Sequence, residues 1–381
     1  MSFDFDKVFD RRHTDSLKWN KYKGRDVIPM WVADMDFQSP APILEALHKR
    51  VDHGIFGYTA PPDELVQVVV TRMWEMYHWK IEPTWIIWLP GVVPALHLAC
   101  RAFGDDGDEV LTFTPVYPPF LSAPTLSRRQ LKTIPLRREM NRFTLDAERL
   151  KSEISPRSKV LLFCNPHNPV GRRYDRQEIK DIAEICVANN LVLCSDEIHC
   201  DLILDGHKHI PTATLSPEIS ARTITLMAPS KTFNTPGLNC AFAIIENKNL
   251  RTQFRQARKE IVPGVNALGF AACLAAYRDC EPWRTALIDY LAGNKDIVYK
   301  TINEEIPGFS MDDVQATYLA WINVTELGRN DAVHFFRNVG VGLSDGREYG
   351  GDGYVRLNFG CPRKTLLEAL DRMRSAVKAR G

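Results

Sequence analysis

Residues 158–199 read "SKVLLFCNPHNPVGRRYDRQEIKDIAEICVANNLVLCSDEIH", and this stretch decides the fold. Two short apolar runs, 158–166 and 191–197, flank an amphipathic segment at 175–190. Short buried strands that alternate with helices are typical of an α/β fold with a mostly parallel central sheet. Ligands of such folds bind beyond the carboxyl ends of the strands. We therefore expect the functional side chains directly after each strand.

The same alternation extends through most of the chain. The pattern predicts further strands at 84–91, 108–115 and 223–230, and helices at 40–54, 63–79 and 92–104. From about residue 285, helices alternate with short strands such as "YLAWINV" and "YVRLNFG", which predicts a smaller α+β domain. The expected organisation is an N-terminal segment (1–40) that contributes to the small domain, a large domain (41–284) and a small C-terminal domain (285–381).

The composition is that of a soluble globular protein, with 45% hydrophobic and 25% charged residues in 381. The chain has 48 basic and 47 acidic residues, so its net charge is close to zero, and no nucleic-acid or membrane partner is expected. The sequence has no apolar run of membrane-spanning length, and its charged N-terminus lacks the apolar core of a signal peptide. The nine cysteines are scattered without a CxxC pair, which favours reduced thiols and a cytoplasmic location.

Two strand ends offer groups that suit a flat, anionic ligand. Gly91, in "PGVVPA", precedes a helix whose first N–H groups form a natural anion site, although a plain strand-to-helix turn would look the same. Tyr117, in "PVYPPF", could stack on a flat ligand, although a packed loop aromatic is equally compatible.

The strands of the opening stretch end in two further candidates. Asn168, in "NPHNPVG", could offer its amide to a ligand oxygen. Asp196, in "SDEIH", should be buried, and a buried carboxylate needs either an ion pair or a cationic ligand nitrogen. His199 could reach the same place. We expect no metal, because His199 and Cys200 have no second ligand pair with zinc spacing.

A lysine and an arginine complete the candidate site. Lys231, in "PSKTFNTPG", leaves the same sheet edge as Asp196 and is a candidate Schiff-base nucleophile, provided that its pKa is lowered. Arg356, in "YVRLNFG", could clamp a substrate carboxylate in a bidentate fork. An interdomain salt bridge would give the same pattern.

Taken in this order, these motifs resemble the fold type I pyridoxal-phosphate (PLP) enzymes, namely the class I and II aminotransferases and their relatives, over essentially the whole chain. The stretches "RRHTDSLKWNKY" (11–22), "IPMWVADMDF" (28–37) and "ATYLAWINV" (316–324) are similar to the cystathionine β-lyase subgroup of the MalY/PatB type. The resemblance implies a large PLP-binding domain with a mostly parallel sheet and a homodimer with shared active sites.

The resemblance also implies roles for individual residues. Lys231 would bind the cofactor covalently and then move a proton, Asp196 would pair with the pyridinium nitrogen, and Asn168 would bind the phenolic oxygen. Tyr117 would stack on the ring, so that Lys231, Asp196 and Tyr117 form the catalytic set. His199 stands where many aminotransferases have tyrosine. The remaining cofactor contacts implied are Gly91, Val92, Val93 and Ser230, with Tyr58 reaching the phosphate of the neighbouring subunit; the substrate contacts are Arg356, Trp31 and Ala33.

Three positions depart from the usual pattern. Many aminotransferases bind the phosphate with a serine three residues before the lysine and an arginine eight residues after it, where this chain has Ala228 and Asn239. Backbone amides, Ser230 and Tyr58 would therefore carry more of the phosphate binding. Asn20 also replaces the aspartate expected after "KW".

The subgroup resemblance implies a carbon–sulfur β-lyase that cleaves cystathionine or another S-substituted cysteine, or its sulfoxide, to a thiol-type product, pyruvate and ammonia. The same residues would serve an aminotransferase for a large or aromatic amino acid. A protein-binding regulator with residual lyase activity is the third alternative. The sequence does not distinguish cystathionine from a cysteine conjugate or a sulfoxide.

Overall fold

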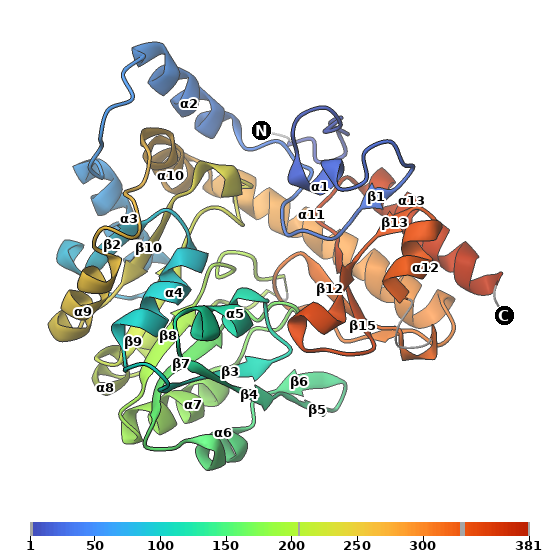
Figure 1. Ribbon diagram of the computed structural model, residues 1–381. Helices are drawn as coiled ribbons and strands as arrows, with labels where there is room; N and C mark the ends of the chain where they lie inside the picture. The colour runs from blue at the N-terminus through green and yellow to red at the C-terminus, as the bar shows by residue number, and fades with distance from the viewer. Residues whose placement is uncertain (1–2, 205, 328–331, 380–381) are drawn as a thin grey trace.

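A computed structural model describes residues 3–204, 206–327 and 332–379 (Figure 1). Its main sheet has seven strands in the order β2-β10-β9-β8-β7-β3-β4. Strand β10 is antiparallel to both neighbours, and the other pairs are parallel. The strands are β2 (Ile86–Leu89), β3 (Glu109–Thr114), β4 (Gln130–Pro135), β7 (Ser158–Cys164), β8 (Val192–Asp196), β9 (Thr223–Met227) and β10 (Ala241–Ile244). The predicted α/β class with a mostly parallel sheet is confirmed.

Helices cover both faces of this sheet because successive side chains of a strand point in opposite directions. In β7, Val160 and Leu162 pack with α4 and α9, whereas Leu161 and Phe163 pack with α7 on the other face. The helices of this part are α4 (Val92–Ala102), α5 (Pro119–Leu126), α6 (Ala147–Glu153), α7 (Arg176–Ala188), α8 (Pro217–Ser220), α9 (Lys248–Arg258) and α10 (Ala267–Asp279), with a small hairpin of β5 (Arg137–Glu139) and β6 (Arg142–Thr144).

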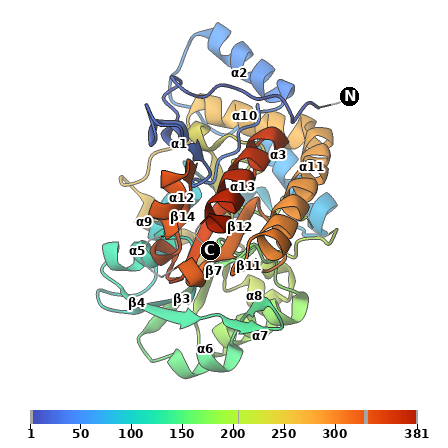
Figure 2. The same ribbon diagram turned by 90° about the vertical axis from the view of Figure 1, so that its right-hand side faces the viewer.

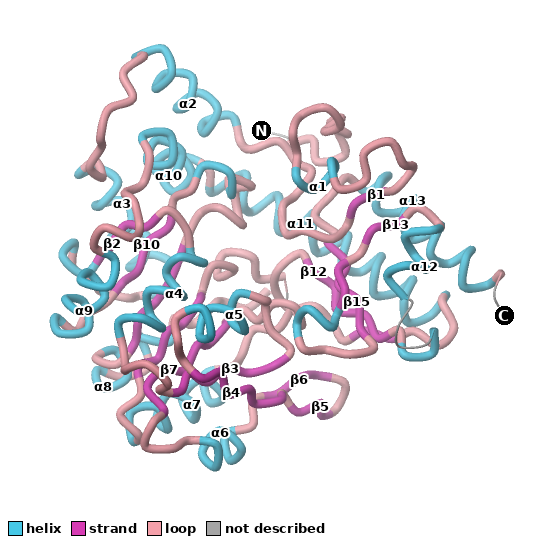
Figure 3. Tube along the Cα trace, in the orientation of Figure 1, coloured by secondary structure: helices cyan, strands magenta, loops and turns pink. Residues whose placement is uncertain are grey.

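A second, antiparallel sheet forms the smaller part of the molecule, in the order β11-β12-β15-β14. Figure 3 shows its strands apart from those of the main sheet, and in Figure 2 two of its helices, α11 and α13, lie in front of β12. The elements are α11 (Glu281–Lys300), β11 (Ser310–Met311), β12 (Leu319–Asn323), α12 (Ala332–Asn338), β13 (Val341–Gly342), β14 (Ser344–Asp345), β15 (Tyr354–Asn358) and α13 (Arg363–Lys378).

The N-terminal residues lie against this smaller part. Strand β1 (Ile28–Pro29) pairs in parallel with β13, after the short helix α1 (Leu17–Asn20). The domain boundaries at residues 40 and 284 stay predictions. Among the described residues, no helix combines the length and apolarity needed to cross a membrane.

Helices α2 (Ala41–His53) and α3 (Asp63–Tyr77) connect the N-terminal residues to the main sheet. The N-cap of α3 is Pro62, and Asp63 is the first helical residue, as the predicted start at 63 requires. The loop between the two helices, residues 54–62, extends along the outside of the molecule (Figure 1). On it Ile55, Phe56 and Tyr58 are exposed.

Candidate active site

A cavity of about 290 Å³ opens at the carboxyl edge of the main sheet, where β3, β7, β8 and β9 end. Parallel strands bring the residues that follow them to one edge, as the sequence predicts. Ten of the predicted site residues line the cavity, namely Ala33, Gly91, Val92, Val93, Tyr117, Asn168, Asp196, His199, Ser230 and Lys231. Asn239, one of the departures noted in the sequence, lines it as well.

Lys231 lies in the turn that follows β9. Its amine donates a hydrogen bond of 2.7 Å to the carbonyl oxygen of Ala33. Desolvation, reinforced by the nearby positive charge of Arg356, lowers the pKa of Lys231 to about 8, although Asp34 and Asp196 act in the opposite direction. A substantial fraction of the amine is therefore neutral near that pH, as a nucleophile or base requires.

Asp196 is the last residue of β8 and is 4% exposed. Burial raises its pKa to about 7, although the N–H of Ile198, at 3.1 Å from Oδ1, stabilises the carboxylate. Within the described part of the chain, no cation forms an ion pair with Asp196. The ion-pair interpretation left open by the sequence is thus not supported there. A buried carboxylate of this kind suits a cationic ligand nitrogen.

His199 lies in the turn that follows β8, three residues beyond Asp196, and is 2% exposed. Its Nδ1 atom is buried and has no hydrogen-bond partner. Desolvation, together with Lys231 and Arg356, lowers the pKa of His199 to about 3, so that the ring is neutral. His199 therefore lines the cavity as a neutral ring, and its buried Nδ1 has no partner among the described residues.

Two loops place Tyr117 and Asn168 next to each other. The N–H of Tyr117 donates to the carbonyl oxygen of Asn168 at 3.0 Å. His167 strengthens the link, because its Nε2 lies 2.8 Å from the carbonyl oxygen of Pro115. The Oδ1 atom of Asn168 accepts from Arg356 at 2.9 Å, which leaves the Nδ2 group of Asn168 to serve a ligand oxygen.

Arg356 lies in β15 of the smaller sheet, directly behind Asn168, and is 3% exposed. Its Nη2 donates to the carbonyl oxygen of Trp31 at 2.7 Å, and its guanidinium lies over the ring of Tyr349. The Nε atom is buried without a partner. No carboxylate of the described residues pairs with Arg356, which disfavours the interdomain salt bridge and leaves the guanidinium to bind an anionic group.

The start of α4 lies at the cavity, where the sequence predicts an anion site. Gly91 is the N-cap, so the first N–H groups of an eleven-residue helix belong to Val92 and Val93, which line the cavity with Ser230. A Cβ atom on Gly91 would meet only Pro94, at an ordinary 3.5 Å. Packing within the described residues therefore does not require glycine there, whereas a closely approaching ligand would.

Three predicted residues lie outside the cavity lining, namely Arg356, which lies behind Asn168, Tyr58 and Trp31. Tyr58 is fully exposed in the loop 54–62, and its predicted role concerns a neighbouring subunit. The indole of Trp31 donates from Nε1 to the carbonyl oxygen of Lys18 at 3.1 Å, and its ring lies under the amine of Lys21. The roles given to Tyr58 and to the Trp31 side chain stay predictions.

Sequence reasoning missed several residues that shape the site. The hydroxyl of Tyr318 donates to the carbonyl oxygen of Ala33 at 3.0 Å, and Asn234 bonds to both the N–H and the carbonyl oxygen of Met35. Both residues lie inside motifs already singled out, "ATYLAWINV" and "SKTFNTPG". Their position within these motifs could have marked Tyr318 and Asn234 as site residues. Their contacts could not have been predicted, because the partners are main-chain groups, which residue types do not reveal.

Comparisons with known proteins agree with this arrangement. Residues 25–373 match the family described as Aminotransferase class I and II. Cystathionine beta-lyase PatB from Bacillus subtilis (strain 168) is 38% identical over 98% of this chain and 99% of PatB. The crystal structure of OvoB has a TM-score of 0.96 at 45% identity, covering 99% of this chain and 100% of OvoB. The PLP-bound C-S lyase from Staphylococcus hominis has a TM-score of 0.93 at 30% identity, covering 99% and 98%.

Proposed function

The chain belongs to the class I and II aminotransferase family, and we propose that it acts there as a PLP-dependent carbon–sulfur β-lyase. Its substrate is cystathionine or another S-substituted cysteine, or the corresponding sulfoxide. The products are a thiol-type product, pyruvate and ammonia. The full-length similarity to PatB, named a cystathionine beta-lyase, and to a PLP-bound C-S lyase supports this choice over transamination.

The residues of the cavity fit PLP. Asp196 is a buried carboxylate without an ion-pair partner among the described residues, which suits the protonated nitrogen of a pyridine ring. The unpartnered Nδ1 of His199 and the Nδ2 of Asn168 suit the polar edge of such a ring. The N-terminus of α4, with Ser230, suits a phosphate. Lys231 would provide the covalent attachment, and Tyr117 would pack against the ring.

When bound, PLP supplies an electron sink that makes the Cα proton of an amino acid acidic and allows a β-substituent to leave. The protein contributes proton transfer, orientation and charge. Arg356 binds the α-carboxylate of the substrate through its guanidinium. This orients the Cα–H bond, and Lys231 Nζ, with a pKa of about 8, removes that proton.

Asp196 and His199 make different electrostatic contributions in the cavity. The negative charge of Asp196 favours a positive charge on the pyridine nitrogen, which the low-polarity surroundings would otherwise disfavour. His199, being neutral, adds a hydrogen bond without a competing charge. In the net reaction, the Cα–H and Cβ–S bonds break, the sulfur leaves as a thiol, and water replaces nitrogen to give pyruvate and ammonia.

The observation that carries this proposal is that Lys231 and Asp196 line one cavity in a chain with full-length similarity to PatB. An assay of pyruvate and thiol release from cystathionine, without any added keto acid, tests it. An aminotransferase would release neither and would convert its substrate only when a keto acid is supplied.

The proposed enzyme is a homodimer with shared active sites. Ile55, Phe56 and Tyr58 are 67%, 58% and 111% exposed on the loop 54–62. Clustered exposed apolar side chains mark interaction surfaces, and a second copy of the chain would cover them. In such a dimer, Tyr58 would reach the phosphate site of the neighbouring subunit.

We also propose a cytoplasmic location. All nine cysteines are free and buried. Buried free thiols without disulfides are typical of proteins in a reducing compartment.

A further inference from the structure

Residues 31–36, named the strap here, lie against the two residues that handle the substrate in the proposed reaction. The carbonyl oxygen of Trp31 accepts from Nη2 of Arg356 at 2.7 Å. The carbonyl oxygen of Ala33 accepts from Nζ of Lys231 at 2.7 Å. The positions of these cationic groups therefore depend on where the strap lies.

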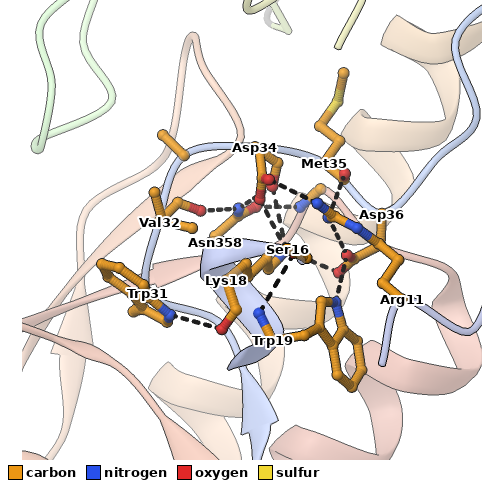
Figure 4. Close-up of polar contacts among 12 residues, drawn as sticks. Arg11, Ser16, Lys18, Trp19, Trp31, Val32, Asp34, Met35, Asp36 and Asn358 are labelled. Carbon is orange, nitrogen blue, oxygen red and sulfur yellow. Dashed lines mark hydrogen bonds and ion pairs between the residues drawn. The ribbon is translucent and has the colours of Figure 1, made fainter. Parts of the chain in front are cut away.

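The strap is anchored by four charged side chains, Arg11, Lys18, Asp34 and Asp36, which we name the clamp (Figure 4). Lys18 Nζ donates to Oδ2 of Asp36 at 2.7 Å and to the carbonyl oxygen of Asp34 at 3.1 Å. Arg11 donates from Nη1 to Oδ1 of Asp36 at 2.7 Å and from Nη2 to Oδ2 of Asp34 at 2.8 Å. Residues 11–18 thus hold the strap through two cations, which pair with two anions of the strap itself.

The central pair of the clamp, Lys18 and Asp36, is buried, which is unusual for charged groups. Lys18 is 1% exposed and Asp36 is 6% exposed. Burial acts to raise the pKa of Asp36, but Lys18, Trp19 and Arg11 outweigh it and lower that pKa below its ordinary value. Such pairs contribute little to stability compared with apolar packing, because desolvation offsets their attraction, but they fix geometry. The clamp is therefore better explained by positioning than by stability.

Further contacts of the strap come from the last residue of β15 in the smaller sheet. Asn358 Nδ2 donates to the carbonyl oxygens of Val32 and Asp34, at 2.6 and 2.7 Å (Figure 4). Every carbonyl from residue 31 to residue 35 accepts a hydrogen bond from a side chain. The strap is not paired as a strand of a sheet, and its carbonyl groups are bonded to side chains instead. Those side chains therefore set its position.

We propose that Lys18 and Asp36 are positioning residues of the lyase reaction, because they hold the strap whose carbonyls orient Lys231 and Arg356. The roles of Lys231 and Arg356 rest on the proposed function. The clamp touches neither, and it acts through the strap.

The test compares Lys18→Met and Arg11→Met enzymes with wild type, and uses Lys23→Met as the matched control, since Lys23 is an exposed lysine of the same segment. KM and kcat are measured with cystathionine, and amide hydrogen exchange is followed in the strap of the holoenzyme. We expect both clamp variants to raise KM about tenfold through Arg356, to lower kcat per folded active site at least about threefold through Lys231, and to speed exchange at Met35 and Asp36 about tenfold. The control should match wild type in all three.

A merely structural role would lower kcat in proportion to the loss of folded enzyme and leave KM unchanged, and that outcome overturns the proposal. The proposal is also overturned if the folded variants have the same KM and the same amide exchange rates as wild type. If Lys18→Met does not fold, Arg11→Met decides by the same criteria, because Arg11 is 24% exposed and easier to replace. If wild type releases no pyruvate, the proposed function fails, while the exchange rates still decide whether the clamp holds the strap.

Discussion

The amine of Lys231 donates its hydrogen bond to the carbonyl oxygen of Ala33, at 2.7 Å and across 198 residues of sequence. A carbonyl stabilises an ammonium ion less than a carboxylate does, so this partner is compatible with a lowered pKa of Lys231. The same carbonyl accepts from Tyr318, which fixes its direction. The carbonyl oxygen of Ala33 thus connects the N-terminal segment with a residue that follows β9 of the main sheet and a residue that precedes β12 of the smaller sheet.

Replacement of Lys231 by alanine should abolish the visible absorbance of covalently bound cofactor and lower pyruvate release by at least about 10³-fold, because both attachment and proton transfer are lost. Absorbance spectroscopy and a pyruvate assay measure the two effects. A retained absorbance band would contradict the assignment of Lys231.

The rate at which the cofactor-free protein takes up PLP should rise with pH, with a midpoint near the lowered pKa of Lys231, about 8. Only the neutral amine is a nucleophile, and its fraction grows as the pH passes through that pKa. Stopped-flow absorbance over a range of pH measures it. A midpoint near 10.5, the ordinary value for lysine, would show that the site does not depress the pKa.

Replacement of Asp196 by asparagine should lower kcat/KM by about 10²-fold or more, since a neutral amide favours a ring cation less. The cofactor-free variant should nevertheless be at least as stable as wild type near neutral pH, because an uncompensated buried carboxylate is removed. Steady-state kinetics and urea denaturation measure these effects. A large loss of stability at neutral pH would show that Asp196 has a structural partner.

The same residue predicts a pH dependence. Since burial raises the pKa of Asp196 from 3.8 to about 7, the folded protein binds the extra proton between these values, and stability falls as the pH rises through that window. Relative to Asp196→Asn, cofactor-free wild type should lose on the order of a few kcal/mol of unfolding free energy between about pH 4 and pH 8. If the unfolding free energies of the two proteins change with pH by the same amount, the raised pKa of Asp196 is refuted.

Replacement of Arg356 by glutamine should raise KM for every amino-acid substrate about 10- to 100-fold, whatever the sulfur substituent, because the α-carboxylate loses its charged partner. Arg356 pairs with no carboxylate of the described residues, so its positive charge is available to the substrate. An increase in KM confined to one thio-substituent would place Arg356 at the other end of the substrate.

Mixed protomers test the shared site. Tyr58→Phe and Lys231→Ala proteins, each impaired alone at limiting cofactor, should recover activity when their subunits exchange, with about one site in four intact in a random mixture. Activity of the mixture, with exchange followed by tagged subunits, is the measurement. No recovery after proven exchange would assign Tyr58 a role outside the neighbouring site.

Much of the site could be predicted because strand ends carry it. Asp196 and Lys231 follow apolar runs, and parallel strands bring such residues to one edge. Strand β10 was not foreseen, although residues 240–245 form an apolar run, and its antiparallel place between β2 and β9 depends on long-range pairing that the local sequence does not show. The strap was missed for a different reason. Its carbonyl oxygens are main-chain atoms, which every residue carries, so their alignment with Lys231 and Arg356 has no signature in the residue types.

The most direct measurement of the central claim is release of pyruvate by the holoenzyme from a panel containing cystathionine, other S-substituted cysteines and a cysteine sulfoxide. No keto acid is added, and Lys231→Ala serves as the control. We expect stoichiometric pyruvate and ammonia from at least one member, with a thiol-type product in equal amount, and none from the control. Turnover that occurs only after a keto acid is added, with no pyruvate from any sulfur substrate, would contradict the assignment as a carbon–sulfur β-lyase.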